Sequence, residues 1–132
     1  MIRTEHLTKD FGNNRGAFDV NLTVPKGNIY GFIGPNGAGK TTTIKALCGL
    51  LKLTSGKAFI NDIEVRPANS RRIKRLIGYM PDKFGVYEQM SVWEYLDFFC
   101  AAYRIPAKRR RPRVEAVLEL TDASYMIDYQ MG

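Results

Sequence analysis

One segment constrains the fold of this 132-residue chain more than any other: GPNGAGKT at residues 34–41, which matches G-x-x-x-x-G-K-[ST] at every fixed position. The compact apolar run NIYGFI (28–33) precedes this segment and is typical of a buried strand. The apolar side chains of residues 40–51 recur at helical spacing. A glycine-rich loop between a strand and a helix is the setting of a phosphate-binding loop, so the pattern predicts an α/β core.

The residue types of this loop suit a bound polyphosphate. Glycines allow positive φ, which turns successive backbone N–H groups inward to form an anion-binding nest. The N-terminus of the following helix adds further N–H groups and a partial positive charge. Lys40 is expected to reach the β- and γ-phosphates, and Thr41 to offer its hydroxyl to Mg²⁺. We expect MgATP as the ligand, bound by Gly34, Gly37, Ala38, Gly39, Lys40 and Thr41; a chance match on an ordinary glycine turn is the alternative.

The rest of the chain predicts an antiparallel sheet beside this core and a helical segment after it. We base these expectations on alternating apolar residues, clusters of turn residues and apolar residues at helical spacing. Ser91 followed by Glu94 predicts a capping box, and Pro112 inside the last helix either costs a hydrogen bond or marks a late start. We expect strands over 2–9, 17–24, 28–33, 57–60, 63–65 and 76–80, and helices over 40–51, 69–75, 91–103 and 106–120.

Composition limits the other functions open to the chain. The formal charge is +7, which suits an anionic partner, but the basic runs 71–75 and 108–113 lack the interleaved aromatic or glycine platforms of nucleic-acid binders. We therefore interpret both runs as solvated helix faces, and nucleic acid is not an expected partner. Cys48 and Cys100 are expected to be reduced thiols, and His6 is given no catalytic role.

The longer stretch GFIGPNGAGKTTTIKALCGLLKLTSGKAFI (31–60) resembles the N-terminal half of the nucleotide-binding domain of an ABC transporter. The resemblance extends over about residues 2–120. It implies a P-loop NTPase core with a flanking antiparallel β-subdomain and the beginning of an α-helical subdomain. On this basis residues 1–87 form the nucleotide-binding core with its Walker A loop, and residues 88–132 begin the helical subdomain.

The resemblance also implies roles for individual residues. Phe11 stands where an aromatic ring stacks on adenine, with a core phenylalanine as the alternative. Asn36 and Thr42 would add contacts near the γ- and α-phosphates. Asp82 occupies the Q-loop position, where the family has glutamine; a carboxylate can bind Mg²⁺ but cannot donate a hydrogen bond when ionised, and a loop aspartate capping a turn is the alternative. The segment from Tyr87 to Trp93 would contact the membrane permease.

The implied protein is an ATPase subunit that couples ATP binding and hydrolysis to transport through a permease. It would work as a dimer of nucleotide-binding domains, in the cytoplasm at the inner face of the membrane. The signature motif, the strand ending in Asp-Glu and the later histidine of the family do not occur in the sequence, so we expect a truncated cassette. The alternatives are a short nucleotide-binding module without turnover and a soluble ATPase of the same type acting on ribosomes or in DNA repair.

Overall fold

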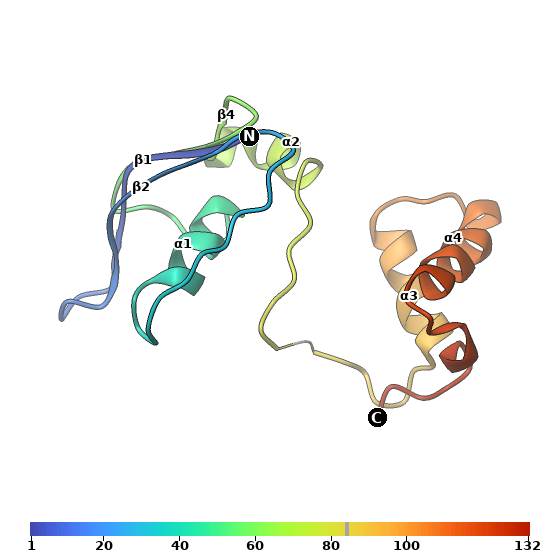
Figure 1. Cartoon of the computed structure of the whole chain (residues 1–132). Coiled ribbons are helices and arrows are strands. Elements are labelled where there is room, and N and C mark those ends of the chain that lie inside the picture. The colour runs from blue at the N-terminus through green and yellow to red at the C-terminus, as the bar shows by residue number, and fades with distance from the viewer. Residues whose placement is uncertain (84) are drawn as a thin grey trace. The chain divides into compact units, whose positions relative to one another are not determined.

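The computed structural model describes residues 1–83 and 85–132, which divide into two compact units, Met1–Met80 and Pro81–Gly132. The first unit contains four strands and two α-helices, and the second contains two α-helices (Figure 1). The elements of the first unit are β1 (Ile2–Asp10), β2 (Gly16–Val24), α1 (Lys40–Leu47), β3 (Ser55–Ile60), β4 (Ile63–Glu64) and α2 (Ser70–Lys74). Those of the second unit are α3 (Val92–Ala102) and α4 (Ala107–Leu120).

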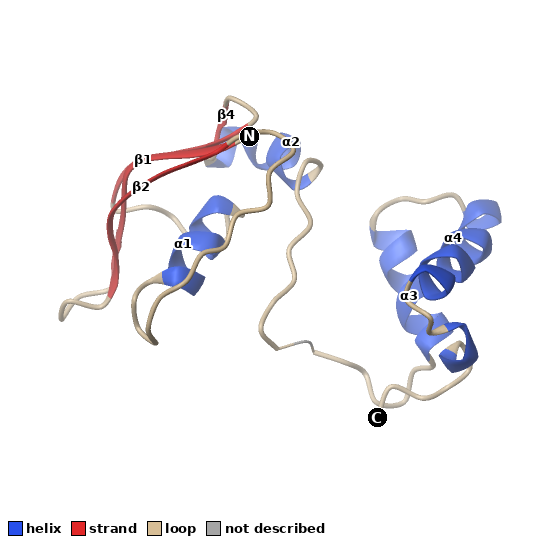
Figure 2. Cartoon of the chain, viewed as in Figure 1, coloured by secondary structure: helices blue, strands red, loops and turns tan. Residues whose placement is uncertain are grey.

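The strands of the first unit form one antiparallel sheet in the order β2-β1-β3-β4. Figure 2 draws the strands in red. β1 is central to the sheet, since its Ile2 pairs with Val24 of β2 on one side and with Ile60 of β3 on the other. A buried cluster joins this sheet to α1; its members are Leu7, Ala17, Ala46 and Ala58. Small alanines at three of these four positions let the helix that follows the glycine-rich loop pack closely on the sheet.

The β3–β4 hairpin is built on a two-residue turn. Asn61 and Asp62 have φ of 46° and 61°, and Ile60 pairs directly with Ile63. Positive φ at both central residues is the geometry of a type I′ turn, which Asn and Asp tolerate better than most residues. The Asn61 side chain also accepts a hydrogen bond of 2.8 Å from the chain's N-terminal amine, which ties β1 to this turn.

Two of the expected strands are wrong. Residues 28–33 and 76–80 form no strand among the described residues, although their composition is apolar. Ile29, Ile33 and Met80 are 103%, 93% and 79% exposed. A strand requires a partner for its backbone N–H and C=O groups, and neither segment is hydrogen-bonded to the sheet, which therefore contains only its antiparallel part. The helix expected over 40–51 also ends earlier, at Leu47.

The second unit begins its helices with the capping box that the sequence predicts. Ser91 Oγ accepts a hydrogen bond from the Glu94 backbone N–H, and the Glu94 carboxylate accepts one of 2.8 Å from the Ser91 backbone N–H.

α4 starts at Ala107 and continues through Pro112, so the proline sits inside the helix and does not mark a late start. Val114 and Leu118 are its buried residues. Within the described parts of the chain, no helix has the length and hydropathy needed to cross a membrane.

Candidate functional site: the glycine-rich loop

The loop expected to bind phosphate leads directly into α1. Gly39 is the N-cap residue of this helix, with φ of 82° and ψ of 7° in the left-handed region. No side chain of the described residues caps this end of α1, so none occupies its first N–H groups as an internal acceptor. Uncapped N–H groups behind a glycine turn have the arrangement that accepts an anion at a helix N-terminus.

Lys40 closes the loop from within. Its ammonium donates hydrogen bonds of 2.5 Å to the Gly34 carbonyl and 2.6 Å to the Pro35 carbonyl. The side chain therefore folds back over the first residues of the loop. A second turn bond, from Ala38 N–H to the Pro35 carbonyl at 3.3 Å, shapes the middle of the loop. Lys40 can reach an incoming phosphate only by exchanging its carbonyl partners.

Gly39 is required by packing as well as by its backbone angle. A Cβ atom built on it would lie 2.6 Å from the Gly16 carbonyl oxygen and 3.0 Å from Ala17. Ala17 is 2% exposed, so the first residues of β2 form a fixed wall behind the loop. Sequence reasoning did not find this contact, because it joins segments that are more than 20 residues apart.

Thr43 anchors the same glycine from inside the helix. Its hydroxyl donates to the Gly39 carbonyl at 2.9 Å, and the Thr43 backbone N–H donates to that oxygen at 2.8 Å. Thr43 is fully buried. The sequence analysis did not assign a role to Thr43, although a threonine four residues after a helix N-cap is placed to bond that residue's carbonyl, and this spacing is a signal that was available.

The remaining loop residues lie at the surface. Thr41 and Asn36 are exposed, and Thr42 is half-buried. Gly37 has φ of 85°, as expected for a loop that turns its backbone inward. Their contacts with nucleotide and metal stay predictions. The Thr41 hydroxyl is accessible, which fits an oxygen ligand for Mg²⁺.

Phe11 follows β1 at the end of the hairpin that backs the loop. Its ring is 56% exposed, and the Lys9 ammonium lies 5.1 Å from the ring centroid. Its backbone N–H donates to the Arg15 carbonyl at 2.8 Å, within the turn that leads to Gly16. An exposed ring is available for stacking and is not a core residue. Its contact with adenine remains a prediction.

Two expected functional segments belong to the second unit. Asp82 is exposed, and its role at the Q-loop position stays a prediction. The segment from Tyr87 to Trp93 is held by the last residues of the chain: Val92 N–H donates to the Tyr129 carbonyl and Trp93 N–H to the Ile127 carbonyl, both at 2.9 Å. Tyr87 is 63% exposed. This backbone pairing presents a surface whose contact with a permease stays a prediction.

Part of the basic run 108–113 is used within the second unit. Arg110 lies 3.5 Å from the Asp97 carboxylate, and Arg111 lies 2.9 Å from that of Glu115. The Arg111 guanidinium is also 5.3 Å from the centroid of the Trp93 ring. The contacts of Arg110 with Asp97 and of Arg111 with Trp93 join α4 to α3, whereas the Arg111–Glu115 pair lies within α4. This run was expected to be a solvated helix face, and two of its arginines instead take part in contacts between the helices.

Three side chains of the described residues, Asp19, Glu94 and Cys48, have a shifted pKa. A hydrogen bond from His6 lowers the pKa of Asp19, whose carboxylate lies 2.7 Å from the imidazole Nδ1. Hydrogen bonds from Ser91, first from its backbone N–H, lower the pKa of Glu94. Burial raises the pKa of the Cys48 thiol. His6, which sequence reasoning left without a role, thus takes part in a hydrogen bond that joins β1 to β2.

Comparison with protein families matches residues 17–131 to the family described as ABC transporter. The chain is 36% identical over 119 residues to the probable multidrug ABC transporter ATP-binding protein YbhF of Escherichia coli, which covers 90% of this chain and 20% of that protein. It is 32% identical over 123 residues to the carnitine transport ATP-binding protein OpuCA of Listeria monocytogenes, which covers 92% of this chain and 31% of that protein. The chain therefore spans less than a third of the length of these curated relatives.

Solved structures of ABC transporter ATP-binding proteins share the fold of this chain. An ATP-binding subunit of an ABC transporter matches with a TM-score of 0.81 at 25% identity, over 98% of this chain and 54% of that one. The ATP-binding cassette MJ0796, solved as a dimer with ADP and Pi, matches in fold with a TM-score of 0.82 at 22% identity, over 99% of this chain and 62% of that one. The expected α/β fold of a partial cassette is confirmed. The chain belongs to the family of ABC transporter ATP-binding proteins.

Proposed function

We propose that this chain binds MgATP through residues 34–41 as the ATP-binding part of an ABC transporter. The observation that carries the proposal is the start of α1: a left-handed Gly39, an uncapped helix N-terminus and a lysine ammonium on one short loop. Backbone N–H groups and one cation together match the charge of a triphosphate. Thr41, and Asp82 in the second unit, are the oxygen ligands proposed for Mg²⁺, which stabilises the negative charge between the phosphates.

Replacement of Lys40 by alanine tests the loop directly. We expect Lys40→Ala to abolish detectable ATP binding in a nucleotide titration, because it removes the only ammonium that lies on the loop in the described structure. Lys45→Ala is the matched control, since Lys45 is an exposed lysine in the last turn of the same helix and should leave the affinity unchanged. Unchanged affinity in Lys40→Ala would remove the phosphate-loop assignment.

We further propose that the 132-residue chain alone binds ATP without efficient hydrolysis. Lys40 and Thr41 supply electrostatic binding and a metal ligand, and neither can act as the general base for an attacking water. A phosphate-release assay on the purified chain should stay at the background rate while nucleotide titration shows binding. Steady phosphate release that disappears in Lys40→Ala would contradict this part of the proposal.

In a complete protein, we propose that two such cassettes act together and that ATP binding and hydrolysis are coupled to transport through a permease. The exposed Tyr87 and the backbone-paired segment that follows it are the proposed contact with the permease. The chain would then lie at the cytoplasmic face of the membrane, held there by its partner.

A further inference from the structure

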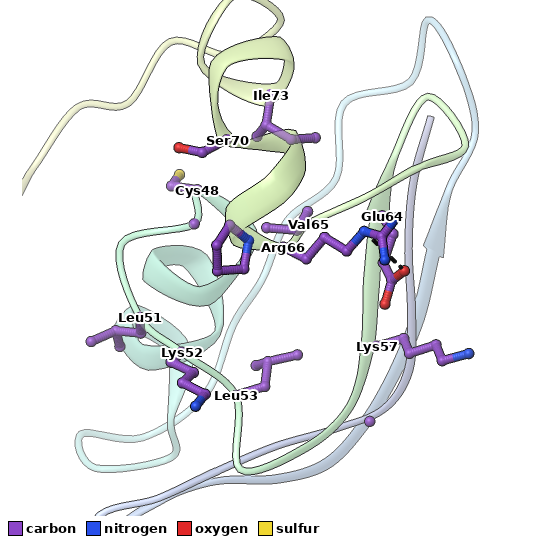
Figure 3. A pocket seen from close by; sticks show the side chains of 13 residues that line it. Cys48, Leu51, Lys52, Leu53, Lys57, Glu64, Val65, Arg66, Ser70 and Ile73 are labelled. Carbon is purple, nitrogen blue, oxygen red and sulfur yellow. Dashed lines mark ion pairs between the residues drawn. The ribbon is translucent and has the colours of Figure 1, made fainter.

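A cavity separate from the glycine-rich loop lies in the first unit. It is bordered by the residues that follow α1, by the β3–β4 hairpin and by α2 (Figure 3). Its volume is about 550 Å³. Cavities of roughly 300–1,000 Å³ are the size that proteins use for small-molecule ligands. This cavity is therefore large enough for a compact organic molecule.

The inner wall of the cavity is apolar. Ile73 of α2 is 1% exposed, and Leu51, Leu53 and Val65 are half-buried. In Figure 3, Leu53 and Val65 lie between the chain that follows α1 and the hairpin. An apolar body placed against this wall would bury its own surface and the exposed parts of Leu51, Leu53 and Val65, at a gain of roughly 25 cal/mol for each Å² of apolar surface removed from water.

Positive charge borders the same space. Lys52 is exposed, and the Arg66 guanidinium lies 3.7 Å from the Glu64 carboxylate with its side chain 58% exposed. This single long ion pair is open to solvent, so an incoming anion can take the place of Glu64 or share the guanidinium with it. Residues 1–80 carry 13 Lys and Arg against 5 Asp and Glu, which adds a favourable field for an anion.

We propose that this cavity binds a small amphipathic anion, with an aromatic or short aliphatic body on Leu51, Leu53, Val65 and Ile73 and one carboxylate or sulfonate group at Arg66. The apolar wall selects the body and the cationic border selects the charge. The site shares no lining residue with residues 34–41. The proposal therefore stands independently of nucleotide binding at the loop.

The probe is 1-naphthoate, titrated into the full chain and followed by the NMR signals of its methyl groups. We expect saturable shifts at Leu51, Leu53, Val65 and Ile73. The neutral analogue 1-naphthalenemethanol should bind about tenfold more weakly, which is the effect of losing one charge-assisted hydrogen bond. Equal affinity for the acid and the alcohol would overturn the proposal, because the cationic border would then contribute nothing.

Variants locate the site. Arg66→Ala should weaken 1-naphthoate about tenfold and leave the alcohol unchanged. Arg109→Ala removes one exposed guanidinium from the second unit and should change neither affinity.

Ser70→Phe places a ring in the cavity and should abolish binding of both compounds. Lys40→Ala should have no effect, which separates this site from the phosphate loop. Shifts centred on Ile29 and Ile33, or displacement of the probe by ATP, would show that the anion binds elsewhere.

Discussion

Lys40, Gly39 and Thr43 all act on the backbone of the glycine-rich loop. Lys40 bonds two carbonyl oxygens at its start, and Thr43 bonds the Gly39 carbonyl at its end. Gly39 itself leaves no room for a side chain because the Gly16 carbonyl lies behind it. Each contact restrains a different point of the loop, so the arrangement of its N–H groups also depends on the buried Thr43 and on the Gly16 carbonyl behind Gly39.

Thr43→Val tests this restraint at a single atom. The change keeps the shape of a fully buried side chain and removes the hydroxyl that bonds Gly39. We expect the free energy of unfolding to fall by about 0.5–1.5 kcal/mol, as is usual for one internal hydrogen bond, and ATP affinity to fall with it. Urea unfolding and a nucleotide titration provide the two measurements. Thr43→Ser keeps the hydroxyl and should retain more of the affinity than Thr43→Val.

The position of the loop could be predicted from the sequence, whereas the long-range contacts that fix its backbone could not. The spacing of glycine, lysine and threonine is local, so Gly34, Lys40 and Thr41 follow from the motif alone. The wall formed by Gly16 and Ala17 is a contact between distant segments, and no periodicity in the chain encodes it. The exposure of Phe11 likewise depends on how the turn between β1 and β2 leaves the sheet.

At the scale of elements, the sequence predicted best those helices and strands that are encoded by short local patterns. β1, β2 and the β3–β4 hairpin form where alternation and turn residues predict them, and the capping box starts α3 as expected. The strands expected over 28–33 and 76–80 do not form, because apolar composition indicates burial only if a partner surface is present. A helix satisfies its own backbone, whereas a strand depends on its neighbours.

The capping box of α3 predicts a dependence on pH. Hydrogen bonds from Ser91 lower the pKa of Glu94 below its usual value of 4.5, so the ionised form is favoured in the folded chain. Its stabilising effect should be complete above that value and should be lost as the pH falls through the lowered pKa. Trp93 is the only tryptophan and follows the cap, so its fluorescence reports on this helix. Urea midpoints of the native chain and of Glu94→Gln should therefore converge as the pH falls below about 4.5.

The same cap can be tested without a change in charge. Ser91→Ala removes the hydroxyl that accepts from the Glu94 backbone N–H. We expect unfolding followed by Trp93 fluorescence to show a loss of about 1 kcal/mol, the usual value for an N-cap serine. Ser124→Ala, in the short 3₁₀ turn Ser124–Met126, is the control and should have little effect. An unchanged midpoint in Ser91→Ala would mean that this cap does not hold α3.

At the scale of the whole molecule, exposed apolar side chains are the dominant feature of the first unit outside its sheet. Ile29 and Ile33 are almost entirely accessible to solvent, and Met80 is 79% exposed. Their segments were expected to be buried strands, and they retain unpaired backbone groups together with apolar side chains. Such segments favour association with another chain.

We therefore expect the purified chain to self-associate as its concentration rises. Sedimentation velocity should show the weight-average mass increase, and the double change Ile29→Lys and Ile33→Lys should keep the chain closer to a monomer. Val86→Lys and Tyr87→Lys, at exposed positions of the second unit, form the matched control. A native chain that stays monomeric and unfolds in one cooperative transition would contradict this expectation.

The bonds of Lys40 to Gly34 and Pro35 have a thermodynamic consequence. The ammonium already has partners, so a phosphate entering this loop exchanges one set of hydrogen bonds for another. The heat of binding then reflects a difference between two sets of contacts. A ligand without negative charge, such as a nucleoside, gives the ammonium no contact that compensates for the loss of its two carbonyl partners. The loop can therefore discriminate between ligands by their charge, whatever contacts the base makes.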